Sequence, residues 1–149
     1  MKAGETTGLD TNVLVLADDA ASPHNARAKA ILEQVLKGSL RACISQQVLA
    51  EYFSVVTSPR RLARPLKVNE AMERVRFLSK SRKIRKIYPK RSTLLRCVEY
   101  CAGKGITGPR IFDAQYAFTL MDNGIKRLIT QNVRDFSAFE GLKAENPFA

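Results

Sequence analysis

The chain has 149 residues, 45% of them hydrophobic, and its 25 basic residues exceed its 14 acidic ones to give a net charge of +11. This length and composition predict one globular domain over residues 1–149. They exclude general disorder, and no apolar run is long enough to cross a membrane. Three cysteines and one histidine argue against a disulfide framework and a structural zinc site. Because the start of the chain also lacks a signal-peptide core, we expect a cytoplasmic protein.

The first half of the chain alternates short apolar runs with amphipathic helices. An apolar run over residues 9–16 is interrupted by three polar residues and predicts a strand that ends and turns into a helix. Residues 24–37 carry apolar side chains at helical spacing and predict a helix that ends at Gly38. Residues 41–44 predict a strand, and Ser45 is placed to cap the helix that follows it.

The second half continues the alternation, with bounds that follow from apolar spacing and from Gly and Pro residues. The expected elements are a helix over 68–78, a strand over 84–88 ended by Pro89, a helix over 94–102 stopped at Gly103 and Gly105, a helix from near Pro109 to Asn123, and a strand over 127–130. Short strands that alternate with helices are typical of α/β proteins. We therefore expect an α/β sandwich with a short, mostly parallel sheet.

The positive charge is concentrated in one segment, residues 59–91, which we expect to be largely helical. This segment holds 13 basic residues against two acidic ones, so its net charge equals that of the whole chain. A nucleic acid is a natural partner, because each neutralised phosphate releases counterions. An acidic protein is a second partner that fits this charge, and a solvated face that only aids solubility is the simplest alternative.

Four acidic residues occupy unusual positions, at strand ends or among apolar neighbours. Asp10 follows the first apolar strand, Glu51 lies in a largely apolar helix, Asp113 lies in the first turn of a helix, and Asp135 follows the last expected strand. The carboxyl ends of parallel strands form the ligand crevice of an open α/β sheet, so we expect these acids to meet there with Asn132. Singly, each has a simpler explanation as a helix cap, a favourable charge at a helix start or a turn residue.

A cluster of carboxylates points to a divalent cation, because neighbouring negative charges raise one another's pKa and a hard cation removes that cost. With no His or Cys nearby, Mg²⁺ or Mn²⁺ is favoured over Zn²⁺. Such clusters suit phosphodiester hydrolysis by metal-activated water. The sequence therefore predicts a metal-dependent hydrolase acting on a nucleic acid.

Four motifs, in this order, resemble those of the PIN-domain ribonucleases. They are Leu-Asp-Thr-Asn-Val-Leu-Val at 9–15, Ser-Gln-Gln-Val-Leu-Ala-Glu at 45–51, Ile-Phe-Asp-Ala-Gln-Tyr-Ala at 111–117 and Ile-Thr-Gln-Asn-Val-Arg-Asp-Phe at 129–136. Within that family, the chain is similar to the toxins of VapBC toxin–antitoxin pairs. The resemblance implies a three-layer α/β/α sandwich and Mg²⁺- or Mn²⁺-dependent RNA cleavage. It also implies a homodimer and inhibition by an acidic antitoxin protein.

The resemblance also implies which residues act. Asp10, Glu51 and Asp113 take the three best-defined acidic positions, as catalytic residues and metal ligands. Many family members have an acid where this chain has Asn132, whereas others have the Asn with an Asp three residues later, as here. Asp135 is thus expected to be the fourth ligand or to reach the metal through water, and the choice between Asn132 and Asp135 stays open.

Other residues are expected to support this site. Thr130 would orient Asp10 from the neighbouring strand, and Asn12 would hold the loop around that acid. The polar residues 4–8 predict a short first strand. The residues expected to hold RNA phosphates are Arg82, Lys83, Arg85 and Lys86.

Three other functions remain open. A phosphatase of the haloacid-dehalogenase type would use Asp10 as a nucleophile, but its motif is Asp-x-Asp and this chain has Asp-Thr-Asn. A non-catalytic or regulatory RNA-binding PIN-like domain would have lost acids, of which three are intact here. An RNA-processing nuclease without an antitoxin would share the chemistry and differ in its gene neighbourhood.

Overall fold

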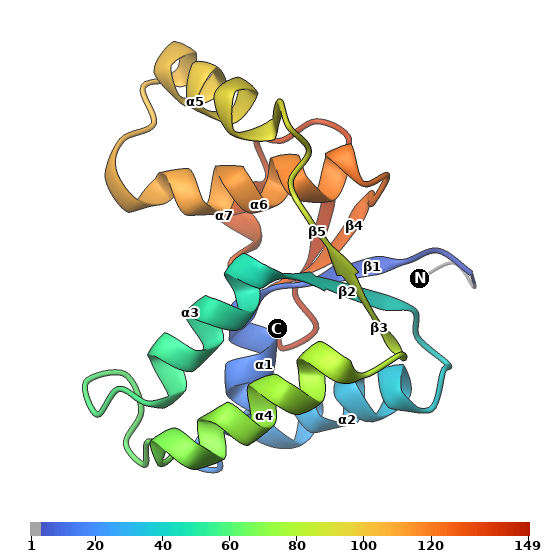
Figure 1. The fold of residues 1–149 in the computed structure, drawn as a ribbon, viewed down its shortest axis with the longest axis vertical. Helices are drawn as coiled ribbons and strands as arrows, with labels where there is room; N and C mark the ends of the chain where they lie inside the picture. The colour runs from blue at the N-terminus through green and yellow to red at the C-terminus, as the bar shows by residue number, and fades with distance from the viewer. Residues whose placement is uncertain (1–3) are drawn as a thin grey trace.

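The computed structural model describes residues 4–149, so residues 1–3 of the chain start discussed above lie outside it (Figure 1). The strands are β1 (Thr7–Leu9), β2 (Ala42–Ser45), β3 (Ile84–Ile87), β4 (Arg127–Ile129) and β5 (Lys143–Glu145). The helices are α1 (Thr11–Asp18), α2 (Asn25–Leu36), α3 (Gln46–Val56), α4 (Val68–Lys80), α5 (Thr93–Lys104), the 3-10 helix η1 (Gly108–Arg110), α6 (Ile111–Asp122) and α7 (Val133–Phe136).

The strands form one sheet in the order β3-β2-β1-β4-β5, and every neighbouring pair is parallel. Parallel neighbours need long crossover connections, which the helices supply. Helices α1–α4 lie on one side of the sheet, and α5 and α6 lie on the other (Figure 1). The expected three-layer α/β/α sandwich is confirmed, and the sheet is wholly rather than mostly parallel.

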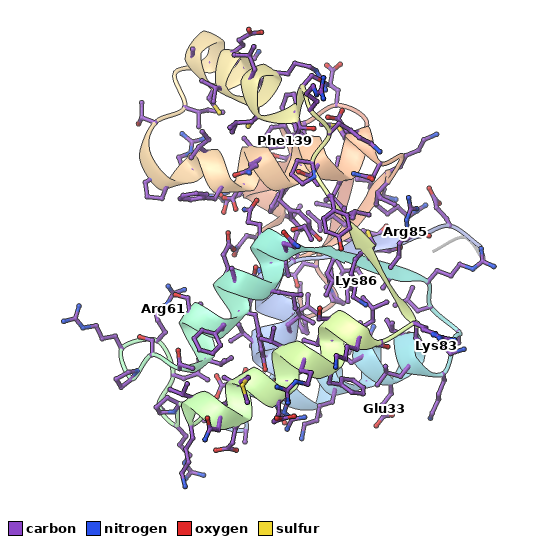
Figure 2. The ribbon with its side chains drawn as sticks, in the orientation of Figure 1. Glu33, Arg61, Lys83, Arg85, Lys86 and Phe139 are labelled. Carbon is purple, nitrogen blue, oxygen red and sulfur yellow. The ribbon has the colours of Figure 1, made fainter. Side chains whose placement is uncertain are left out.

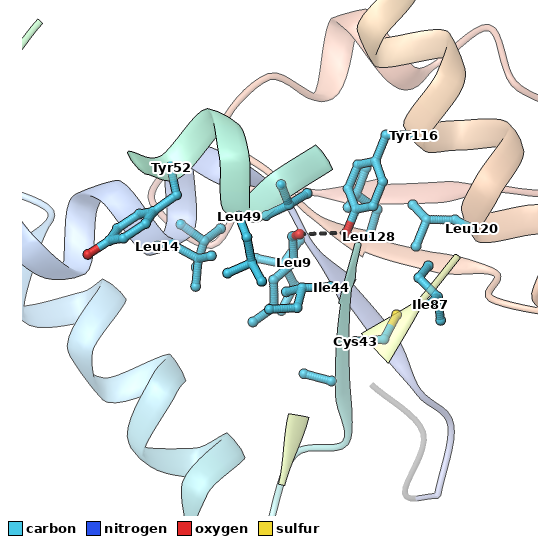
Figure 3. Close-up of a cluster of buried hydrophobic side chains, with 14 of the residues drawn as sticks. Leu9, Leu14, Cys43, Ile44, Leu49, Tyr52, Ile87, Tyr116, Leu120 and Leu128 are labelled. Atoms are coloured by element: carbon cyan, nitrogen blue, oxygen red, sulfur yellow. Dashed lines mark hydrogen bonds between the residues drawn. The ribbon is translucent and has the colours of Figure 1, made fainter. Parts of the chain in front are cut away.

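The core fills the space between the sheet and its helices (Figure 3). Leu9, Ile44 and Leu128 lie on three adjacent strands and are fully buried. Tyr116 of α6 is also buried, and its phenolic O–H donates to the backbone carbonyl of Leu9 at 2.6 Å. A buried hydroxyl is costly unless it is hydrogen-bonded. This bond therefore satisfies the phenol and also holds the end of β1 just before Asp10.

The first strand is short, with three residues, as its polar surroundings predict. A Cβ atom at Gly8 would lie 2.6 Å from Cδ2 of Leu120, which is fully buried in α6. Glycine therefore allows α6 to pack directly against the middle of β1. This close packing brings the start of α6 toward the carboxyl end of the sheet.

Three details differ from the expectations. Helix α5 continues through Gly103 and ends at Gly105, whose φ of +67° is the left-handed conformation that glycine adopts without strain. The short helix α7 and strand β5 had no clear sequence signal. β5 is a three-residue edge strand with Lys143 and Glu145 at its ends, so it lacks an apolar alternation.

The basic segment 59–91 is helical only over α4, and it begins in a loop and ends beyond β3. α4 is the longest helix, with 13 residues. In the described part of the chain, no helix is both long and apolar enough to cross a membrane.

Candidate active site

Asp10 lies at the carboxyl end of β1 and at the N-cap of α1, and only 8% of its surface is exposed. Its Oδ1 accepts the backbone N–H of Thr11 at 2.8 Å, so it does cap the helix. Its Oδ2 accepts the hydroxyl of Thr130 at 2.7 Å and the amide of Asn12 at 3.3 Å. Burial raises the pKa of Asp10 above its usual value, and these hydrogen bonds oppose only part of that rise. The cap role and a place in the acid cluster are therefore compatible.

Thr130, directly after β4, is the centre of a small network around Asp10. Its hydroxyl donates to Asp10 and accepts the backbone N–H of Asn132 at 2.9 Å. Asn12 accepts the backbone N–H of Gln131 at 3.1 Å, which connects α1 to the loop after β4. Side-chain hydrogen bonds around the buried Asp10 carboxylate thus join the C-terminal ends of β1 and β4.

Glu51 reaches the same place from α3, where it is half-buried. Its Oε2 accepts the hydroxyl of Thr11 and its Oε1 accepts the amide of Gln47, both at 3.0 Å. Gln47, one helical turn earlier, also donates to the backbone carbonyl of Phe112 at 2.8 Å. The amide therefore orients Glu51 and joins α3 to the start of α6. Gln47 had not been singled out from the sequence, although its spacing of four residues from Glu51 places both on one helix face.

Asp113 lies in the first turn of α6 and is half-buried. Burial raises the pKa of Asp113 to about 6, with further contributions from the charges of Asp10, Asp135 and Glu51, while Arg110 opposes the rise. These interactions show that the four acids, from four segments of the chain, are close enough to repel one another. The pKa of Asp113 is raised by the charges of all three other acids.

The fourth position involves two residues of the last acidic loop. Asn132 lies at the start of α7 and lines the same cleft as Asp10, Glu51 and Asp113. Asp135 is exposed and does not line this cleft. The backbone N–H of Asp135 donates to the carbonyl of Asn132 at 3.0 Å, so α7 fixes the two relative to each other. Asn132 thus lies in the cleft with the three acids, and Asp135 lies outside it but near enough for its charge to act on Asp113.

The cleft formed by these residues has a volume of about 800 Å³. Its walls come from α1, α3, the loop after α3, the start of α6 and the loop after β4. The residues that line it include Asp10, Asn12, Glu51, Arg61, Phe112, Asp113 and Asn132. This size is within the ordinary range for ligand pockets.

The donor set fits a hard divalent cation in its chemistry. The donors are carboxylate and amide oxygens, and a cation would offset the burial and the neighbouring charges that raise the pKa of Asp113. Within residues 4–149, however, no three His, Cys, Asp or Glu side chains are gathered at a spacing that would hold a metal ion. Hydrogen bonds hold Asp10 and Glu51 to Thr130, Thr11 and Gln47, and these bonds orient both carboxylates.

The four basic residues expected to hold RNA lie away from this cleft. Arg82 and Lys83 precede β3, at the amino end of the sheet, opposite the acids. Lys86 donates its ammonium to the carbonyls of Ser81 and Ile84 at 2.6 and 2.7 Å. Figure 2 shows Lys83, Arg85 and Lys86 on the side of the molecule away from Arg61. Of the basic segment, it is the loop before α4 that reaches the acids.

Comparison with known proteins agrees with this architecture. Residues 9–142 match the family model for the PIN domain. The chain is 27% identical over 140 residues to Ribonuclease VapC24 of Mycobacterium tuberculosis, a match that covers 93% of this chain and 94% of that protein. It is 28% identical over 143 residues to Ribonuclease VapC48 of the same organism, covering 94% and 96%.

Solved structures share the fold. The crystal structure of VapBC2 from Rickettsia felis bound to a DNA fragment from their promoter matches with a TM-score of 0.65 and 24% identity, over 95% of this chain and 98% of that one. The structure of Mycobacterium tuberculosis VapC20, a sarcin-ricin loop cleaving toxin, matches with a TM-score of 0.66 and 14% identity, over 92% and 98%. Because the family model spans most of the chain and the fold agrees, this protein belongs to the PIN domain family.

Proposed function

We propose that this protein is a metal-dependent endoribonuclease and the toxin of a toxin–antitoxin pair. The observation that carries this is the convergence of Asp10, Glu51 and Asp113 on one cleft in a PIN domain. The two relatives reported above are both named ribonucleases, and they match the chain over nearly its full length.

The acids would act as the ligands of Mg²⁺ or Mn²⁺. Asp10, Glu51 and Asp113 would hold the cation, with Asn132 or Asp135 at the fourth position. When bound, the cation activates water for attack on phosphorus and stabilises the leaving oxygen. Hydrolysis of this kind is expected to leave a 5′-phosphate and a 3′-hydroxyl.

The surrounding polar residues would keep the ligands in place. The Thr130 hydroxyl and the Asn12 amide hold one oxygen of Asp10, while Thr11 and Gln47 hold Glu51. Carboxylates fixed in this way lose little conformational entropy when a cation binds. A phosphatase reaction with Asp10 as nucleophile is disfavoured, because its Asp-x-Asp motif requires an acid where this chain has Asn12.

We infer an acidic antitoxin as the protein partner, because the chain carries a net charge of +11. A second cleft of about 400 Å³ between α1, α2 and α4 offers a surface for it. This cleft has an apolar floor that includes Leu14 and Leu32. Two basic residues, Lys29 and Arg74, and two acidic residues, Asp18 and Glu33, also line it, and Arg74 pairs with Asp18 at 3.5 Å. A helix with one apolar face would fit this floor, and the net positive charge of the whole chain favours an acidic one.

A homodimer is the second proposed assembly. Helix α5 exposes three large apolar side chains, Leu94, Leu95 and Val98, of which Leu95 is 65% exposed. Such a group of apolar side chains marks an interaction site more often than a free surface. The mass of the protein in solution, measured for the wild type and for Leu95→Lys, tests this. A monomeric wild type would refute the dimer.

The function is tested by cleavage of a mixed pool of tRNA, rRNA and mRNA by the purified protein in Mn²⁺. Cuts that disappear in EDTA and in the double variant Asp10→Asn/Asp113→Asn are expected, and mapping them identifies the target. Equal cutting by the double variant would reject this site. RNA binding without cutting would instead favour the non-catalytic RNA-binding function.

A further inference from the structure

The acid-lined cleft contains two side chains that the metal chemistry does not use, Phe112 and Arg61. We propose that they bind one strand of RNA, with a base stacked on the Phe112 ring and a neighbouring phosphate on the Arg61 guanidinium. This inference rests on the proposed ribonuclease function and specifies how the substrate is held. Single-stranded RNA is the substrate class, because a base paired in a duplex is not free to stack on a side chain.

Phe112 is a large aromatic ring on the wall of the cleft, directly before Asp113, and 51% of it is exposed. No other aromatic ring of the described residues packs against it, unlike the contacting rings of Tyr100, Phe118 and Phe139. Its backbone carbonyl accepts the Gln47 amide at 2.8 Å. The backbone of Phe112 is therefore held beside the acids, and its half-exposed ring lines the cleft.

A half-exposed aromatic ring in a nuclease cleft is suited to a nucleobase. Every base presents a π-face, so stacking binds RNA without selecting a particular sequence. The apolar side chain also has little to gain from exposure to water. Because Phe112 and Asp113 are consecutive, a base stacked on the ring would place its own phosphates near the acids.

Arg61 supplies the positive charge that such a strand requires. Among the described residues that line the cleft it is the only cation, and no carboxylate of residues 4–149 forms an ion pair with it. The acids of the cleft repel phosphates, and a cation in the same cleft offsets that repulsion.

The loop that carries Arg61 is anchored. The backbone N–H groups of Arg61 and Leu62 both donate to the carbonyl of Ser58, at 3.1 and 3.0 Å. The side chain of Leu62 is buried, with 4% exposed. A buried residue directly beside Arg61 holds the backbone of Arg61 at the cleft. Arg60 and Arg64 of the same loop do not line it.

The stacking is tested with two ligands of equal length, a ten-nucleotide oligouridine and the corresponding abasic ribose-phosphate strand. Their binding to the full-length protein is measured by fluorescence anisotropy in EDTA, so that no cleavage occurs. The wild type should bind the base-bearing strand roughly 5- to 100-fold more tightly. Phe112→Leu should remove most of that preference, and Phe112→Tyr should keep it. Phe77→Leu is the matched control, since Phe77 is 54% exposed and lies outside this cleft.

The phosphate contact is tested by the salt dependence of oligouridine binding. Arg61→Gln should lower the slope of log Kd against log salt by about 0.7, the value for one contact with a single strand. Arg64→Gln removes the same charge from the same loop and should leave the slope nearly unchanged. Equal effects of the two variants would show that only the general charge of the loop matters, and the Arg61 contact would be rejected.

Other outcomes would overturn the stacking. A wild type that binds both strands alike, or a Phe112→Leu variant that keeps the preference for bases, rejects it. A Phe112→Leu variant that changes from dimer to monomer while keeping that preference assigns the ring to a protein interface. Cleavage is scored separately in Mn²⁺. A wild type that prefers bases through Phe112 but cuts no RNA would therefore reject the nuclease and leave the RNA contact standing.

Discussion

Burial of the Asp113 carboxylate and repulsion by the acids around it should make the metal-free protein less stable than it would be without that charge. The pKa of Asp113 is raised from the ordinary 3.8 to about 6, which corresponds to about 3 kcal/mol. Asp113 is only half-buried, so solvent screening reduces this to about 1–2 kcal/mol. We expect Asp113→Asn to be more stable than the wild type by this amount at pH 7.5 in EDTA. For a chain of this size that is a rise in Tm of about 2–6 °C.

The pH dependence follows from the direction of the pKa change. Below about pH 3, Asp113 is protonated in both the folded and the unfolded chain, so its charge costs nothing. As the pH rises from about 4 to 6, the unfolded chain loses the proton first, and the wild type loses stability. Asp113→Asn cannot lose this proton. The stability difference between the two proteins should therefore vanish near pH 3 and be complete above pH 7.

A bound cation should reverse the order. A ligand at 100 times its Kd stabilises the folded state by about 2.7 kcal/mol. Mn²⁺ at that excess should therefore raise the Tm of the wild type a few degrees above that of the variant, which lacks one ligand. Calorimetry with and without Mn²⁺, with circular dichroism to confirm the fold, measures both effects. A variant that is less stable in EDTA, or that gains as much from Mn²⁺, would refute the reasoning.

Three further outcomes are expected. Thr130→Val should lower the free energy of unfolding in urea by about 1–3 kcal/mol and also reduce cleavage, because it removes the hydroxyl that holds Asp10. Thr119→Val is the control, because it loses only a hydrogen bond to a carbonyl of its own helix and should leave cleavage unchanged. An equal loss of cleavage in both variants would contradict the role of Thr130 in positioning Asp10. Tyr116→Phe should lower the free energy of unfolding by about 1–3 kcal/mol in the same urea titration, since it leaves the Leu9 carbonyl without its buried donor. An unchanged unfolding midpoint would contradict this role of the Tyr116 hydroxyl. The third change neutralises three basic residues that lie far from the acids, Arg82, Lys83 and Arg85. It should reduce the salt dependence of RNA binding without changing kcat. A large fall in kcat would show that these residues act nearer the reaction than the structure places them.

The sequence was informative about the site because the acids follow recognisable strand and helix boundaries. Asp10 comes directly after an apolar strand, and Asp113 falls in the first turn of a helix. The carboxyl ends of parallel strands share one edge, so local boundaries sufficed to predict that these acids meet. The contact of Thr130 with Asp10 was expected from the family resemblance, although 120 residues separate the two in the chain. Gln47, which orients Glu51, was not expected, because it carries no charge and belongs to no acidic position of the motifs.

The sequence by itself determined the alternation of strands and helices, and with it the layered fold, because apolar spacing is a local property of the chain. It also identified the acids at strand and helix boundaries. Only the tertiary structure placed the basic segment. Residues 82–86 were expected at the RNA site, yet Arg82 and Lys83 lie at the amino end of β3 and Arg61 lies in the acid cleft. The same packing added β5, whose three residues form a strand only because β4 offers an unpaired edge. The sequence shows how many charges a segment carries, but only the placement of its strand in the sheet decides which end of the sheet those charges face. Pairing at a sheet edge likewise depends on the neighbouring strand.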